Sequence, residues 1–190
     1  KVNLFNSACS VFSVVERLFH TRYNGYTMTS SSFFAYLTRL RFIGRWGLKR
    51  NSVPENVMEH SWEVAVIAHA LAVIRNKEFG GQVDANRVAV AALFHDASEV
   101  YTGDMPSPIK YHSPAITAAY KAIEQRAQYD LQHMLPERLQ SVYQGLLLES
   151  SWDAQTHELI KAADIIAAVL KCRAELLAGN QEFAVAAREV

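Results

Sequence analysis

The chain has 190 residues, of which 50% are apolar and 20% are charged, and its formal net charge is zero. This length suits one globular domain with a sizeable core. The neutral composition provides no basic field that would attract nucleic acid or an anionic membrane. We therefore expect neither of them as a partner.

Helices dominate the pattern of apolar residues, and no segment alternates as a half-buried strand does. Gly80 and Gly81 predict a loop, and 103–108, which contains two prolines, predicts a second loop. Ser113 followed by Pro114 is typical of a helix start. We predict an all-α, single-domain bundle with five or six core helices. Their approximate ranges are 30–43, 55–76, 84–101, 113–135, 137–149 and 153–179.

The two ends of the chain depart from this pattern. Residues 1–27 have no clean period, and they are interpreted either as a loosely attached N-terminal extension or as an extra helix on the bundle. The domain proper is expected to cover 28–190. Its last residues, 183–190, resemble a helix that is cut short, so we expect the C-terminal end of the domain to be truncated.

Two cysteines, Cys9 and Cys172, are too few for a disulfide framework. We therefore expect a reducing, cytoplasmic compartment. The chain has no unbroken apolar run of the roughly 18 residues that span a bilayer. Its first residues also lack the order of basic, apolar and small residues that is typical of a signal peptide.

The most informative pair is His95–Asp96, which lies in the otherwise apolar run Ala-Leu-Phe-His-Asp-Ala-Ser-Glu. A buried carboxylate without a partner is costly, and a divalent metal that binds both side chains removes this cost. His60 and Asp164 lie in predicted helices elsewhere and are further candidate ligands.

Helical spacing supports this hypothesis. His60 falls on one stripe with Val64, and His95 falls on one face with Val88 and with Glu99, which is one turn later. Each residue has a plainer interpretation, such as a core histidine, a hydrogen-bonded aspartate or, for Glu99, an exposed helix carboxylate. The combination predicts a metal site.

Two imidazoles and two carboxylates suit Mn, Fe, Co, Ni or Zn better than Ca or Mg. An ion of this kind can hold a water molecule, lower its pKa and neutralise charge on a phosphoryl group. Glu99 would then be placed to take up the proton or to pass it to a leaving group.

Several longer motifs make the stretch from Met28 to Val190 resemble the bacterial HD-domain 5′-deoxynucleotidases of the YfbR type. The generic His-Asp pair is a weak signal of substrate, whereas Arg-Trp together with Thr-Gly-Asp-x-Pro-Ser-Pro is much more specific. The matching motifs, in family order, are Arg-Trp, Glu-Asn-Val-Met-Glu-His-Ser, Phe-Gly-Gly, Phe-His-Asp-Ala-Ser-Glu-Val-Tyr-Thr-Gly-Asp-Met-Pro-Ser-Pro-Ile-Lys-Tyr and Lys-Ala-Ala-Asp.

The resemblance implies a metal-dependent phosphomonoesterase that hydrolyses deoxyribonucleoside 5′-monophosphates, with a metal-bound water as the nucleophile. It implies one divalent transition metal held by His60, His95, Asp96 and Asp164, with Glu99 as the catalytic carboxylate. It also implies a homodimer. In the family, Thr is often present where this chain has Ser107, which keeps the hydroxyl.

The resemblance further implies that Arg45 binds and orients the phosphate, through the two parallel hydrogen bonds that a guanidinium can donate. Trp46 is interpreted either as an apolar surface for the sugar or base or as a core residue. Within the implied substrate-binding set, Asp104 would accept a hydrogen bond from the 3′-hydroxyl of the sugar. The full set is Arg45, Trp46, His60, Asp96, Asp104, Met105, Pro106 and Ser107.

Two alternatives stay open. One is another HD-superfamily phosphohydrolase that acts on a cyclic dinucleotide, an alarmone or a deoxynucleoside triphosphate. These substrates carry more charge and would favour extra Lys and Arg, which the neutral composition does not supply. The other is a non-catalytic helical interaction module. A module of that kind would be expected to lose Glu99 or Arg45, and both residues are present.

Overall fold

The computed structural model describes residues 31–190, and over this range it contains helices and no strand. The all-α prediction is therefore confirmed. The expected boundary between residues 27 and 28 and residue 30, the first residue of the helix predicted over 30–43, lie outside the described residues. The helices are α2 (Phe33–Leu37), α3 (Val57–Glu78), α4 (Ala85–Leu93), α5 (Glu99–Thr102), α6 (Ser107–Lys110), α7 (Pro114–His133), α8 (Glu137–Leu147), α9 (Ala154–Leu177) and α10 (Ala186–Glu189), with 3₁₀ turns at Thr38–Phe42, Glu149–Ser151 and Gln181–Phe183.

Side chains cap the helices that carry the site and the core. At the start of α3, Asn56 Oδ1 accepts a hydrogen bond from the Glu59 amide at 3.0 Å. Asp153 accepts the Thr156 amide at the start of α9, at 2.8 Å. Asp84 and Ser113 cap α4 and α7 in the same way. Each oxygen satisfies a backbone donor that has no partner within its own helix.

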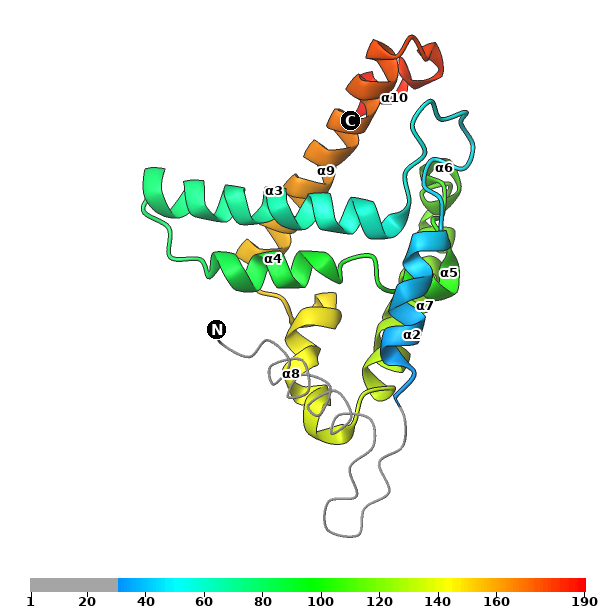
Figure 1. The fold of residues 1–190 in the computed structure, drawn as a ribbon. Helices are drawn as coiled ribbons and strands as arrows, with labels where there is room; N and C mark the ends of the chain where they lie inside the picture. The colour runs from blue at the N-terminus through cyan, green and yellow to red at the C-terminus, as the bar shows by residue number, and fades with distance from the viewer. Residues whose placement is uncertain (1–30) are drawn as a thin grey trace, which may run out of the picture.

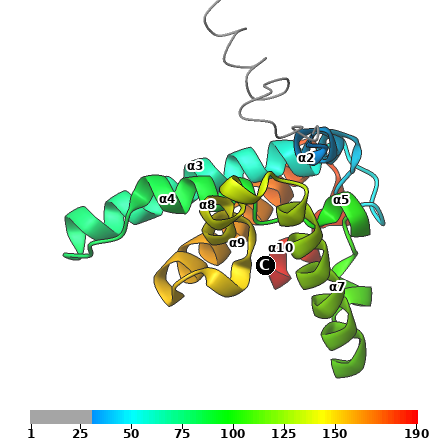
Figure 2. The same cartoon turned by 90° about the horizontal axis from the view of Figure 1, so that it is seen from below.

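The largest core cluster lies between α3, α4 and α9, with α3 and α4 side by side and α9 crossing them (Figures 1 and 2). Alanine predominates here, which lets the helix backbones approach closely. Its buried members are Val64, Ala65, Ala68, Ala72, Val88, Ala91, Ala92, Leu159, Ile160, Ala163 and Ala167. Helix α3 is long and apolar enough to cross a membrane by length and composition alone, but its packing is that of a core helix.

A second core cluster forms around Phe33, which is fully buried and contacts the rings of Phe94 and Tyr143. A regular helix over the predicted range 30–43 would place Phe34 inside, and this expectation is wrong, because Phe34 is 51% exposed. The predicted first helix is also broken: α2 has five residues and continues as a 3₁₀ turn, which changes the phase of the inward-facing side chains.

The predicted helix over residues 84–101 is interrupted, which corrects the sequence-based geometry of the His-Asp pair. Helix α4 ends at Leu93 and α5 begins at Glu99. Between them, backbone hydrogen bonds span three residues, as in the bond from the Glu99 amide to the Asp96 carbonyl at 3.0 Å. His95 and Asp96 therefore lie on tight turns, because the chain there tightens from α-helical to 3₁₀-like spacing.

A buried polar cluster holds the long loop between residues 43 and 56. The Glu175 carboxylate, on α9, accepts the backbone amides of Ser52 at 2.8 Å and Val53 at 3.1 Å. It also accepts hydrogen bonds from Lys171 and from Asn180. Although burial opposes ionisation, these donors hold the pKa of Glu175 well below its usual range. The loop is thereby fixed to the C-terminal part of α9.

Candidate metal centre

Three predicted ligands from two segments come together. The ligand atoms of His60, His95 and Asp96 lie within 4.8 Å of one another. The Asp96 Oδ2 atom is 3.1 Å from His95 Nε2 and 3.6 Å from His60 Nε2. His60 comes from the first turns of α3, and the pair comes from the turn after α4. The packing of α3 against α4 therefore builds this cluster.

Both imidazoles direct Nε2 into the cluster. The Nδ1 atom of His95 is 2.8 Å from the Ala92 carbonyl oxygen, which can only accept, so in the neutral ring Nδ1 carries the proton and Nε2 has the lone pair. Neither Nε2 atom has a hydrogen-bond partner within residues 31–190, although both are buried. Buried nitrogen atoms that face a carboxylate without hydrogen-bonding it fit a shared cation. The residues present therefore fit a divalent transition metal.

Asp164, the fourth predicted ligand, lies beside the cluster. Its Oδ1 atom is 3.3 Å from His60 Nε2, and its Oδ2 atom accepts from Lys161 Nζ at 2.9 Å. Its neighbours in the sequence are apolar, which predicts burial, but its side chain is 26% exposed. Burial opposes ionisation, but His60, His95 and Lys161 lower the pKa of Asp164 well below its usual range. The carboxylate is therefore charged and ready to bind a cation.

Asp96 is also held in its charged form. Burial would raise its pKa, but His95, His60 and Arg45 outweigh burial and lower the pKa well below its usual range. For His95, burial opposes the charged form, and the adjacent Asp96 carboxylate nevertheless raises its pKa. In both residues the neighbouring charge decides the direction of the shift.

Glu99 lies next to this cluster, and its carboxyl group differs from those of Asp96 and Asp164 in its protonation. Its carboxyl group is buried, and its Oε2 atom has no hydrogen-bond partner in the described part of the chain. Burial, together with the nearby carboxylates of Asp96 and Asp104, raises the pKa of Glu99 to about 10. The exposed-carboxylate interpretation is therefore wrong. A buried carboxyl group that keeps its proton at neutral pH can act as a proton donor.

Arg45, on the long loop between residues 43 and 56, extends its side chain to the cluster of candidate ligands. Its side chain is 12% exposed, and its Nη1 atom is 3.5 Å from Asp96 Oδ2. Burial lowers the pKa of Arg45, but the surrounding carboxylates, Asp96 and Glu55 foremost, raise it overall. Arg45 is therefore a fixed cation beside the candidate ligands.

A hydrogen bond connects Trp46 with the loop that begins at Asp104. The Trp46 amide donates to Asp104 Oδ2 at 3.1 Å. Trp46 has φ of 60°, a left-handed conformation that is costly for a tryptophan and is common at functional sites. Its ring packs against Phe183, with centroids 5.2 Å apart. Met105 and Pro106 are partly buried and Ser107 is exposed.

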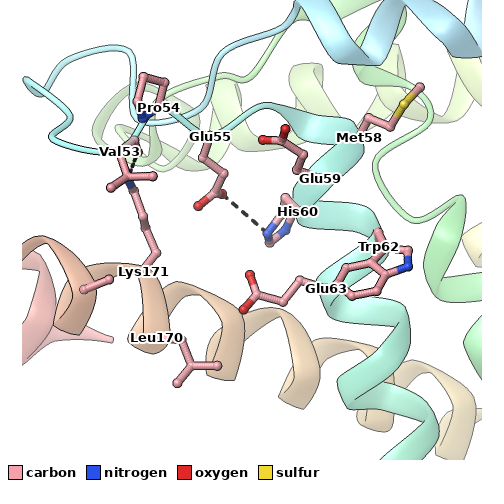
Figure 3. Close-up of a pocket in the computed structure, with 11 residues that line it drawn as sticks. Val53, Pro54, Glu55, Met58, Glu59, His60, Trp62, Glu63, Leu170 and Lys171 are labelled. Carbon is pink, nitrogen blue, oxygen red and sulfur yellow. Dashed lines mark hydrogen bonds and ion pairs between the residues drawn. The ribbon is translucent and has the colours of Figure 1, made fainter.

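Sequence reasoning missed Glu55 and Lys161. Glu55 was seen only as part of a motif, and its Oε1 atom accepts from Arg45 Nε at 2.7 Å. Glu55 and His60 also line a groove of about 840 Å³, in which Figure 3 shows the Glu55 carboxylate directed at the His60 ring. His95, Asp96 and Asp164 do not line this groove. It therefore adjoins the cluster of ligands and does not contain it.

The sequence of the chain is similar to those of known 5′-deoxynucleotidases. A family model described as 5′-deoxynucleotidase YfbR-like matches residues 32–190. The 5′-deoxynucleotidase YfbR of Salmonella paratyphi B is 50% identical over 159 residues, which cover 84% of this chain and 80% of the relative. The same protein of Salmonella newport matches equally well.

Two solved structures share the fold. An HD-domain phosphohydrolase from Listeria innocua has a TM-score of 0.72 and 24% identity, covering 83% of this chain and 76% of the other. A cyanophage S-2L HD phosphohydrolase (DatZ), bound to dA and one catalytic Zn²⁺ ion, has a TM-score of 0.54 and 24% identity, covering 77% and 72%. With its fold shared with HD phosphohydrolases and its sequence matched along almost all of the described range, the chain belongs to the YfbR-like 5′-deoxynucleotidase family.

Proposed function

We propose that the chain is a metal-dependent 5′-deoxynucleotidase, which hydrolyses deoxyribonucleoside 5′-monophosphates to the deoxynucleoside and phosphate. The observation that carries the proposal is the set of histidine and aspartate ligand atoms within 4.8 Å, with the proton-bearing Glu99 and the cation Arg45 beside it. Relatives that are 50% identical and carry the name 5′-deoxynucleotidase support the same reaction.

His60, His95, Asp96 and Asp164 would hold one divalent transition metal. Such an ion, when bound, would lower the pKa of a water molecule and neutralise charge on the phosphoryl group. Zn, Co, Mn, Fe and Ni all suit this ligand set, and the cyanophage neighbour is described with Zn²⁺. The Ala92 carbonyl keeps His95 in the tautomer that metal binding requires.

Arg45 and Glu99 would act on the phosphate ester. Arg45 has N–H groups left after its contact with Glu55, and they can donate to two phosphate oxygens. Burial and the nearby carboxylates raise the pKa of Glu99 and so favour its protonated form, and Glu99 would donate that proton to the 5′-oxygen of the leaving deoxynucleoside.

The loop from Asp104 to Ser107 would contact the sugar. Asp104 Oδ2 is used by the Trp46 amide, so Oδ1 is left to accept the 3′-hydroxyl. Met105, Pro106 and Ser107 would crowd a 2′-hydroxyl and so favour deoxyribose, although discrimination by crowding is modest. Trp46 would support the loop through its backbone, while its ring packs on Phe183.

A phosphate-release assay tests the function. Purified protein is incubated with dAMP, AMP, 3′-AMP, dATP and a cyclic dinucleotide, each with Co²⁺, Mn²⁺ or Mg²⁺. We expect release from dAMP above all, and more with Co²⁺ or Mn²⁺ than with Mg²⁺. Preferred turnover of dATP or the cyclic dinucleotide would favour another HD phosphohydrolase, and no turnover of any substrate would favour an interaction module.

Arg45→Lys is expected to leave the metal content unchanged and to lower kcat/KM for dAMP roughly 10- to 100-fold, the worth of about one charge-assisted hydrogen bond. An ammonium cannot reproduce the two parallel bonds of a guanidinium. Steady-state kinetics and metal analysis measure the two quantities. The matched control is Arg50→Lys on the same loop, where the side chain is 79% exposed. An unaltered rate in Arg45→Lys would remove Arg45 from the phosphate site.

A homodimer is proposed as the solution state. Apolar side chains of α9 are left exposed, including Ile165 at 41%, Ile166 at 36% and Leu170 at 44%. Exposed apolar residues grouped on one helix are typical of a subunit interface. Light scattering at micromolar concentration should give twice the chain mass of 21.3 kDa. A monomeric mass would contradict the dimer.

We also propose a cytoplasmic location. Cys172 is buried and forms no disulfide with any residue in the described range. A buried thiol of this kind is consistent with a reducing compartment.

A further inference from the structure

Glu55 occupies a fixed position at the end of the long loop, directly before the residue that caps α3. Its carbonyl accepts the Arg45 amide at 2.9 Å, and Gly44 and Asn56 form an antiparallel bridge beside this bond. Its side chain is only 14% exposed. The backbone thus holds Glu55 and Arg45 next to each other, although ten residues separate them.

The first contact of the Glu55 side chain orients Arg45. Glu55 Oε1 accepts from Arg45 Nε at 2.7 Å, and Arg45 Nη1 lies 3.5 Å from Asp96 Oδ2. An arginine side chain loses considerable rotamer freedom when it is ordered, and a charge-assisted bond at Nε offsets part of that cost. The guanidinium plane is held from one edge, and its remaining N–H groups are left for an anion.

The second contact concerns His60. Glu55 Oε1 lies 3.7 Å from His60 Nδ1 (Figure 3). The other ring nitrogen, Nε2, faces Asp96 and Asp164. A carboxylate beside Nδ1 favours the tautomer with the proton on Nδ1, and this leaves the Nε2 lone pair for a metal. The Ala92 carbonyl has the same effect on His95.

We propose that Glu55 is a positioning residue that serves both halves of the site: it fixes His60 for metal binding and Arg45 for phosphate binding. This inference rests on the proposed function. One oxygen, Glu55 Oε1, would thereby connect the metal-binding and phosphate-binding parts of the centre.

Metal affinity tests the His60 half without any nucleotide. Glu55→Gln keeps the volume and an oxygen acceptor for Arg45 but removes the charge. Titration of the metal-free protein with Co²⁺ alone should show affinity weakened about 10- to 100-fold, as is usual for the loss of a group that orients a metal-binding histidine. The matched control is Glu59→Gln, an exposed carboxylate one turn further along that lines the same groove. The affinity of this variant should stay within about twofold of the wild type, since the Glu59 side chain forms no hydrogen bond or ion pair with a candidate ligand in the described part of the chain.

A second readout follows the His60 tautomer directly. Nitrogen-15 chemical shifts of the imidazole in the metal-free protein should report the Nδ1–H form in the wild type and a mixture of tautomers in Glu55→Gln. An unchanged tautomer together with unchanged Co²⁺ affinity would overturn the His60 half. Should Glu55→Gln fail to fold, the titration is repeated on Glu55→Asp, which is one methylene shorter, and weaker binding supports the proposal while wild-type affinity overturns it.

A double-variant cycle tests the Arg45 half. Binding of inorganic phosphate is measured by calorimetry for Glu55→Gln, Arg45→Met and the double variant, each at a Co²⁺ concentration that saturates it. If Glu55 acts through Arg45, the double variant should bind phosphate no more weakly than Arg45→Met alone, whereas its loss of metal affinity should persist. Fully additive losses of phosphate affinity would overturn this half. The Co²⁺ titration stands even if the wild type fails to hydrolyse dAMP, so failure of the proposed function is distinguishable from failure of this inference.

Discussion

Asp96→Ala is expected to abolish both metal binding and phosphate release from dAMP. Asp96 Oδ2 faces both histidine Nε2 atoms and Arg45, so its removal takes away the group that the whole cluster shares. Metal analysis after dialysis against Co²⁺ should show less than one ion in ten molecules, and activity should fall to background. His95→Ala should behave in the same way.

The loss of metal has a consequence for stability. An ion that binds only the folded state stabilises it by about 2.7 kcal/mol when present at about 100 times its Kd. The wild type should therefore melt at a higher temperature with Co²⁺ than without it, while Asp96→Ala should show no such shift. Asp130→Ala serves as the control, since Asp130 pairs with Arg126 at the surface. Full activity of Asp96→Ala without bound metal would contradict the proposed centre.

Glu99→Ala and Glu99→Gln are expected to separate catalysis from binding. Both variants should keep the metal and bind dAMP, while kcat falls by about 10²- to 10⁴-fold, the usual cost of losing a general acid or base. The reason is that Glu99 is buried with its proton and has no other polar partner for Oε2 among the described residues. Rapid-quench kinetics and calorimetric titration with dAMP measure the two effects.

The slow Glu99 variants would also report on sugar selectivity. They should retain dAMP more tightly than AMP if the loop from Asp104 to Ser107 contacts the sugar. Glu137→Gln, an exposed carboxylate at the start of α8, should have wild-type kinetics. Loss of metal in Glu99→Gln would place Glu99 among the ligands, and wild-type turnover would mean that another group transfers the proton.

Local residue patterns predicted most of the fold because capping residues and helical periodicity act within a few residues. Asn56, Asp84, Ser113 and Asp153 each begin a helix through their own side chain. The break after Leu93 could not be predicted in this way. Residues 94–98 contain no glycine or proline that would mark a break, and the tightening of their turns is seen only in the folded chain.

Some residues of the candidate site could be predicted from the sequence and others could not, again because only local patterns are visible there. His95, Asp96 and His60 could be found because charged or polar residues in apolar helical runs need a partner. Glu55 lies in a loop without periodicity, and its significance comes from the pairing of Gly44 with Asn56 and from its contact with Arg45. Contacts of that kind depend on tertiary structure, which local spacing does not contain.

The buried cluster around Glu175 couples the opening of two distant parts of the chain. The amides of Ser52 and Val53 are paired with a carboxylate on α9 instead of with a helix or strand of their own. Releasing this loop would leave Glu175 and Lys171 buried without their full set of partners, which is costly. We therefore expect local unfolding of the loop that carries Arg45 to be coupled to undocking of the end of α9, the helix that holds Asp164 about three turns away. The two segments would then open as one cooperative unit, and we expect the amides of Ser52 and Val53 to exchange with solvent at rates close to those of the α9 amides beside them.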